Sequence, residues 1–85
     1  MIVIALGGNA LVKKGEKLSV STQINNVRKA MKSIARVIKK NAVVITHGSG
    51  PQIGSLMLQN EVAKKSVPPM PLYVLDAEVQ GELGY

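Results

Sequence analysis

The chain contains no cysteine, tryptophan or phenylalanine, and has one histidine and two tyrosines among its 85 residues. Without cysteine it can form no disulfide, no thiolate metal site and no cysteine nucleophile. A single histidine also argues against a zinc site. These absences exclude the small scaffolds that depend on disulfides or bound metal for stability.

Long apolar runs are absent as well. No segment approaches the roughly 18 to 20 apolar residues needed to cross a bilayer. The first residues, MIVIALGG, lack the basic leader of a signal peptide. We therefore expect a cytoplasmic protein with no membrane partner.

Acidic residues are scarce. Five Asp and Glu residues stand against eleven Lys and Arg residues, which gives a net charge of +6. Such an excess suits an acidic partner such as nucleic acid. The basic residues fall in small separate groups, however, and only two tyrosines exist to stack on bases. We expect a solvated helix face and basic helix ends, and no nucleic-acid partner.

The residues that are present predict one small α/β domain. Apolar residues make up 46% of the chain, which is in the globular range. Residues 2–6 and 42–46 are short apolar runs typical of strands buried on both faces. Between them, apolar residues recur every three or four positions over about 21–40, which predicts an amphipathic helix capped by Ser19 or Ser21. Strands joined by a helical crossover pair in parallel.

The second half of the sequence is expected to be helical. Pro51 suits the first turn of a helix that reaches about residue 65. Three prolines within 66–71 then impose a loop. A third helix is predicted from the apolar spacing of Leu72, Leu75, Val79 and Leu83. Gly81 inside it indicates close packing, because glycine in a helix costs about 1 kcal/mol relative to alanine.

A sheet of two strands leaves both of its edges open. Parallel sheets are normally extended by further strands and covered by helices on both faces. We therefore expect residues 1–85 to be the N-terminal βαβα part of a larger α/β domain.

Glycine-rich loops follow both predicted strands. The first contains Gly7, Gly8 and Asn9, and the second contains Gly48, Ser49 and Gly50. Ligands bind at the carboxyl ends of strands in open parallel sheets, where glycine lets backbone N–H groups approach an anion. The second loop also opens a helix, whose first N–H groups favour anions. We expect the pair of loops to bind phosphoryl or carboxylate oxygens; tight turns without a ligand are the alternative.

Polar side chains near these loops have two interpretations each. Asn9 offers an amide donor to an oxyanion or closes an Asx turn. Ser49 donates to a substrate or caps the following helix. We expect His47 to make an orienting hydrogen bond and not to act as a catalytic base, since no cysteine or nearby aspartate accompanies it. Lys13 or Lys14 reaches a phosphate or is simply solvated. The motifs fit neither a Walker A loop nor GxGxxG after the first strand.

Taken in order, these motifs resemble the N-terminal part of the carbamate kinases, which belong to the amino-acid kinase family. The resemblance covers essentially the whole chain. It is carried by ALGGNAL (5–11), KKGE (13–16), NNVRKA (25–30), VITHGSGPQIG (44–54) and PMPLYVLDAEVQGELGY (69–85). Two positions depart from the usual family pattern: Ser49 stands in place of Asn, and Tyr73 in place of Asp.

The resemblance implies a three-layer α/β/α fold with an open, mostly parallel sheet, and a homodimer. It implies reversible phosphoryl transfer from ATP, with Mg²⁺, to carbamate, a small-molecule substrate of arginine metabolism. Gly7, Gly8 and Asn9 would face the transferred phosphoryl group as catalytic residues. The loop 48–50 would bind the substrate, and this segment would carry no metal ligand.

The same resemblance places the catalytic lysines and most of the nucleotide site beyond residue 85. We therefore expect the 85-residue chain to be inactive alone and to form the acceptor-substrate side of the domain. Two alternatives remain open. One is another phosphotransferase of the amino-acid kinase family, and the other is a non-catalytic module that binds a partner through its open sheet edge.

Overall fold

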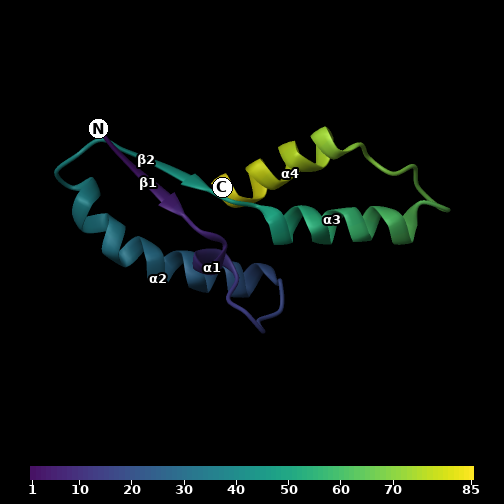
Figure 1. Ribbon diagram of the computed structural model, residues 1–85, viewed down its shortest axis with the longest axis horizontal. Helices are drawn as coiled ribbons and strands as arrows, with labels where there is room; N and C mark the ends of the chain where they lie inside the picture. The colour runs from purple at the N-terminus through teal and green to yellow at the C-terminus, as the bar shows by residue number, and fades with distance from the viewer. The chain divides into compact units, whose positions relative to one another are not determined.

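The structure is a computed structural model that describes residues 1–8 and 10–85, so that Asn9 lies outside the described residues. The chain consists of two compact units, Met1–Gly48 and Ser49–Tyr85. The first contains both strands and two helices, and the second contains a pair of helices (Figure 1). This content confirms the predicted α/β class.

The first unit is built on a parallel pair of strands with a long helix beside it (Figure 1). Its elements are β1 (Ile2–Leu6), α1 (Gly8–Leu11), α2 (Val20–Ile38) and β2 (Val43–His47). Ile2 lies opposite Val43, and the pairing continues in register to Leu6 opposite His47. The predicted strand–helix–strand unit is confirmed. Helix α1 corrects the prediction of a glycine-rich loop after the first strand, because the chain forms one helical turn from Gly8.

Helix α2 begins and ends at polar side chains. The Ser19 hydroxyl accepts a hydrogen bond from the Thr22 N–H at 3.2 Å, so Ser19 is the N-cap. At the other end, the Asn41 side chain donates to the Val37 carbonyl at 3.1 Å. The Ser19 contact satisfies an N–H group that the helix leaves unpaired at its start, and it decides between Ser19 and Ser21 as the cap.

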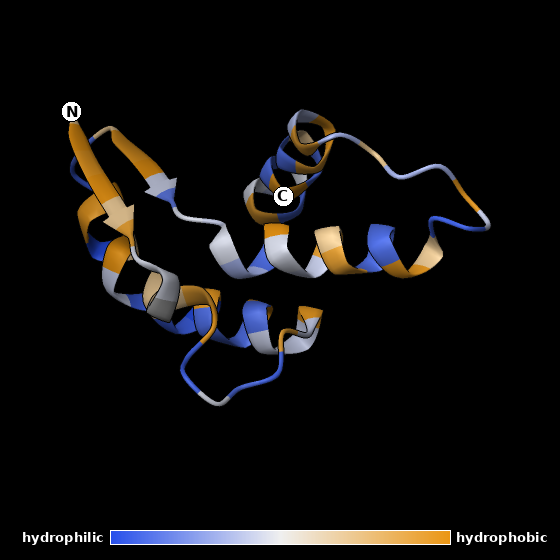
Figure 2. Cartoon of the chain, turned by 45° about the vertical axis from the view of Figure 1, so that its right-hand side comes forward, coloured by the Kyte–Doolittle hydropathy of each residue, from blue (hydrophilic) through white to orange (hydrophobic). Residues whose placement is uncertain are grey.

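The two faces of the strand pair differ in exposure, although the strand residues are hydrophobic on both (Figure 2). Ile2, Ile4 and Leu6 of β1 are half-buried. On the other face Val3 is 64% exposed and its partner Val44 is 44% exposed. Within the described residues only one face of the strands is covered, because the first unit has only one long helix. Burial on both faces stays a prediction for the larger domain.

The second unit is a pair of helices, α3 (Gly50–Ala63) and α4 (Leu72–Gly84), joined by the proline-rich loop (Figure 1). Both predicted helices are confirmed. Asn60 ties the loop to α3, since its side chain donates to the Leu56 carbonyl and accepts from the Met70 N–H, each at 2.8 Å. Of the predicted apolar stripe on α4, Leu75 and Val79 are buried, whereas Leu72 is exposed.

Alanine at Gly15 and at Gly81 is expected to change stability in opposite directions. Gly15 has φ of +86°, where a Cβ costs about 1–2 kcal/mol. A Cβ at Gly81 would meet no atom within 4 Å, so Gly81→Ala is expected to stabilise α4 by about 0.5–1 kcal/mol. The prediction that Gly81 is closely packed is therefore not met in the described residues. Urea denaturation of both variants is the measurement, and changes of the same sign would contradict the geometry.

Candidate functional site

The parallel register brings the start of both glycine loops to the same end of the sheet, where both strands reach their carboxyl ends. Leu6 and His47 are the last paired residues of β1 and β2. The Gly48 N–H points back to the Leu6 carbonyl at 3.4 Å. Gly7 and Gly48 therefore follow neighbouring strand ends within the same unit. This arrangement matches the expected position of a ligand site in a parallel sheet.

Gly7 and Gly8 are held by backbone hydrogen bonds. The Gly7 carbonyl accepts from the Ala10 N–H, and the Gly8 carbonyl accepts from the Val12 N–H, both at 3.0 Å. A Cβ added at either glycine would meet no protein atom within 4 Å, so the space beside both residues is open to a ligand. Asn9, the third predicted residue of this loop, lies outside the described residues.

Ser49 and Gly50 belong to the second unit, where they open helix α3. Ser49 occupies the N-cap position, and its carbonyl accepts from the Ile53 N–H at 3.0 Å. Its hydroxyl makes no capping hydrogen bond. Of the two interpretations of Ser49, the side-chain cap is therefore not realised in this structure.

The ring of His47 contacts the second glycine loop directly. Its Nδ1 lies 3.1 Å from the Gly48 carbonyl oxygen. Because a carbonyl oxygen can only accept, Nδ1 carries the proton in this contact. The orienting hydrogen bond expected of His47 is thus present, and its acceptor is the carbonyl of the Gly48–Ser49 peptide within the loop.

A network of polar groups, which the sequence did not indicate as functional, lies behind the first glycine loop. Asn26 of α2 is 5% exposed. Its Nδ2 donates to the Leu11 carbonyl at 2.9 Å and to Glu16 Oε1 at 3.0 Å. The same Glu16 oxygen accepts from the Lys13 N–H at 2.8 Å. The pattern of residue types did not single out Asn26, which is one of two asparagines between Ile24 and Val27.

These hydrogen bonds lower the pKa of Glu16. The Lys13 backbone N–H has the largest effect, followed by the Asn26 amide, with further help from the positive charges of Lys13 and Lys29. All of them favour the ionised carboxylate. Glu16 is therefore a carboxylate at neutral pH and acts purely as an acceptor.

The lowered pKa predicts a loss of stability in acid. Because the folded-state pKa lies below the usual 4.5, the stabilisation is fully present above that value and disappears as the pH falls through the folded-state pKa. Glu16→Gln is expected to flatten this part of the pH dependence. Melting temperatures between pH 7 and pH 3 provide the measurement, with Glu78→Gln as the control for net charge. If Glu16→Gln left the pH profile unchanged, Glu16 would not be the source of the stability lost in acid.

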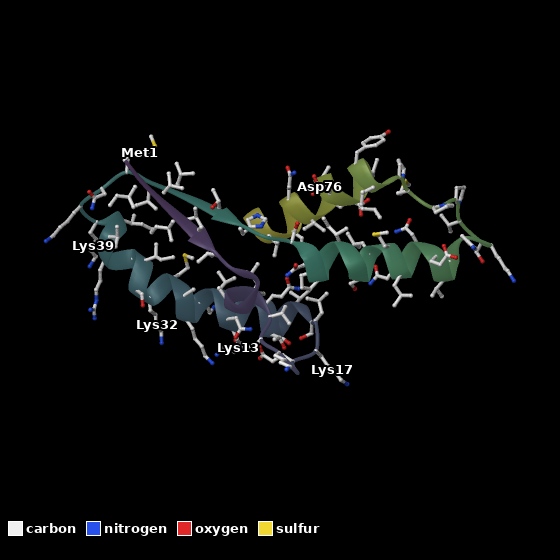
Figure 3. All side chains as sticks on the ribbon, in the orientation of Figure 1. Met1, Lys13, Lys17, Lys32, Lys39 and Asp76 are labelled. Atoms are coloured by element: carbon white, nitrogen blue, oxygen red, sulfur yellow. The ribbon has the colours of Figure 1, made fainter. Side chains whose placement is uncertain are left out.

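Positive charge is concentrated in the first unit. Lys13 and Lys17 lie on the segment after α1, and Lys32 and Lys39 project from α2 and its end, away from the strands (Figure 3). Among residues 1–48 the only acidic residue is Glu16. The Lys and Arg residues of this unit are Lys13, Lys14, Lys17, Arg28, Lys29, Lys32, Arg36, Lys39 and Lys40. Such a field raises the local concentration of anions.

Within residues 1–8 and 10–85, no three His, Cys, Asp or Glu side chains are grouped so that they could hold a metal ion. No helix in that part of the chain is both long and apolar enough to cross a membrane.

Sequence comparison gives the relatives of the chain. The model of the amino acid kinase family matches residues 1–83. A carbamate kinase of Escherichia coli (strain K12) is 49% identical over 84 residues, which cover 99% of this chain and 28% of that protein. A carbamate kinase of Pyrococcus furiosus is 46% identical over 87 residues, with the same coverage of 99% and 28%.

Comparison with solved structures also finds carbamate kinases. A carbamate kinase from Giardia lamblia bound to AMP-PNP superimposes with a TM-score of 0.95 at 46% identity, covering 99% of this chain and 30% of that one. The chain thus spans less than a third of the length of these relatives. A family model that matches nearly every residue, together with this similarity of structure, establishes that the chain belongs to the amino acid kinase family.

Proposed function

We propose that the chain functions in a carbamate kinase, as the acceptor-substrate side of its kinase domain. The reaction transfers the γ-phosphoryl group of ATP to a carbamate oxygen and gives ADP and carbamoyl phosphate, reversibly. The observation that carries the proposal is the adjacency of Gly7 and Gly48 at neighbouring parallel strand ends. The 49% identity to the Escherichia coli carbamate kinase supports the choice of substrate.

In this proposal the two loops have different roles. Gly7, Gly8 and Asn9 face the transferred phosphoryl group, and Gly48, Ser49 and Gly50 hold the oxygens of carbamate or carbamoyl phosphate. Phosphoryl transfer needs reactants held in line and negative charge stabilised on the equatorial oxygens. Backbone N–H groups fixed in glycine loops supply both without reorganising during the reaction.

ATP and Mg²⁺ belong to the proposed reaction. Residues 1–8 and 10–85 contain no group of three His, Cys, Asp or Glu side chains that could hold a metal ion. We place most of the nucleotide contacts in the part of the relatives that the chain does not span. The purified 85-residue chain is therefore proposed to have no kinase activity of its own, and the active protein to be a cytoplasmic homodimer of arginine metabolism.

A chimeric kinase tests the proposal. In it, residues 1–85 of this chain replace the 84 matched residues of the Escherichia coli carbamate kinase. The expected result is ATP-dependent formation of carbamoyl phosphate by the chimera and none by the 85-residue chain alone. A folded chimera that ignores carbamate but phosphorylates another carboxylate would instead identify a different kinase of the family. Turnover by the isolated chain would overturn the assignment of the nucleotide contacts.

A further inference from the structure

We propose that Asn26 is a positioning residue for the first glycine loop, with Glu16 orienting its amide. The identity of the ligand at that loop rests on the proposed function, whereas the positioning itself rests on the geometry of the first unit. Nothing in the sequence pattern assigns either side chain a role in binding or catalysis.

Both hydrogens of the Asn26 side-chain amide are used. Its Nδ2 carries two hydrogens and makes two hydrogen bonds, to the Leu11 carbonyl at 2.9 Å and to Glu16 Oε1 at 3.0 Å. Glu16 is held in turn by the Lys13 N–H at 2.8 Å. The carboxylate therefore fixes the rotamer in which the other hydrogen of Asn26 points at Leu11.

The hydrogen bond to Leu11 restrains the first glycine loop, because one turn of helix connects Leu11 to Gly8. Helix α1 runs from Gly8 to Leu11, and the Val12 N–H donates back to the Gly8 carbonyl at 3.0 Å. Helix α1 is too short to be stable alone in water. Fixing its last carbonyl against α2 therefore fixes the backbone of Gly7 and Gly8, which would point toward the substrate.

Burial makes this contact hard to replace. Leu11 is 3% exposed and Asn26 is 5% exposed, so water has little access to either partner. When the donor is removed, the buried Leu11 carbonyl is left without this hydrogen bond, which is unfavourable because water has little access to replace it. Release of α1 from α2 is therefore the expected response to losing the amide.

Asn26→Asp tests the proposal, because it keeps the size of the side chain and removes both donors. The matched control is Asn25→Asp, which makes the same change of charge at the exposed neighbouring residue of α2. Amide hydrogen exchange of the ¹⁵N-labelled 85-residue chain is measured at Ala10 and Val12, and at Ile4 as the reference for the whole unit. Asn26→Asp is expected to speed exchange at Ala10 and Val12 about 10-fold more than at Ile4.

Binding supplies the second readout, with carbamoyl phosphate as the probe. Asn26→Asp is expected to weaken its affinity about 10-fold. Asn25→Asp is expected to leave it unchanged. Equal acceleration of exchange at Ala10, Val12 and Ile4 would assign Asn26 a general structural role and overturn the proposal. Unchanged exchange at Ala10 and Val12 would do the same.

The two readouts separate the failure of this inference from that of the proposed function. If the wild-type chain does not bind carbamoyl phosphate, the assignment of the glycine loops as its substrate site is contradicted. The exchange at Ala10 and Val12 still decides whether Asn26 positions the first loop. If the wild-type chain binds the probe and Asn26→Asp binds it equally well, the loops retain their role and the positioning role of Asn26 is rejected.

Discussion

Gly48→Ala is expected to lower kcat/KM of the chimeric kinase about 100-fold without changing its fold. Within the part of the chain that the structure describes, a Cβ at Gly48 would meet no atom within 4 Å, so this part accommodates alanine. The added methyl group would instead occupy the space into which the substrate oxygens must come to reach the backbone N–H groups. Steady-state kinetics with carbamate and ATP, together with the melting temperature, provide the measurement.

The control for this experiment is Gly54→Ala. Gly54 lies within α3 and is equally open, with no atom within 4 Å of an added Cβ, but it is not among the proposed substrate-binding residues. Its activity is expected to match that of the parent chimera. If Gly48→Ala retains the same activity as Gly54→Ala, the second glycine loop is a turn and not a substrate site.

Leu75→Ala is expected to destabilise the second unit by about 2–5 kcal/mol. Leu75 is 3% exposed on α4, and it lines a hollow next to Met57 of α3 and Met70 of the loop. Removing its side chain leaves a cavity that a hairpin of two helices cannot fill by small shifts. Because small domains have only about 5–15 kcal/mol of stability in total, the loss should be visible directly in urea denaturation followed by helical circular dichroism.

The matched control removes the same side chain from the exposed side of the hairpin. Leu58 of α3 is 65% exposed, and leucine and alanine are both good helix formers. Leu58→Ala is expected to change stability by no more than about 0.5 kcal/mol. Equal losses in both variants would show that Leu75 is not part of a packed core.

Most of the elements could be predicted because their signals are local. The apolar runs around Ile4 and Ile45 gave both strands, and the three-and-four spacing gave α2 between them. Parallel pairing followed from the connection, and the loops at the strand ends followed from the pairing. From the order of the elements alone, it could thus be predicted that Gly7 and Gly48 follow neighbouring strand ends.

Other features were missed because they depend on contacts distant in sequence. Periodicity placed Ile24 and Ile38 on the packed side of α2, yet both are more than 40% exposed. Of the predicted stripe Ile34 is buried, and the same helix also buries the polar residues Gln23 and Asn26. The partner of Asn26 is a backbone carbonyl 15 residues earlier, and no pattern of residue types indicates which carbonyl an amide will meet.

The parallel register of the two strands also affects the order of folding. Ile2 pairs with Val43, so the sheet forms only after the intervening chain closes into a large loop, with the corresponding loss of chain entropy. The contacts between α3 and α4 are nearer in sequence, which favours their faster formation. During synthesis β1 leaves the ribosome well before its partner exists. A nascent chain therefore carries an unpaired apolar strand until residues 43–47 have been made.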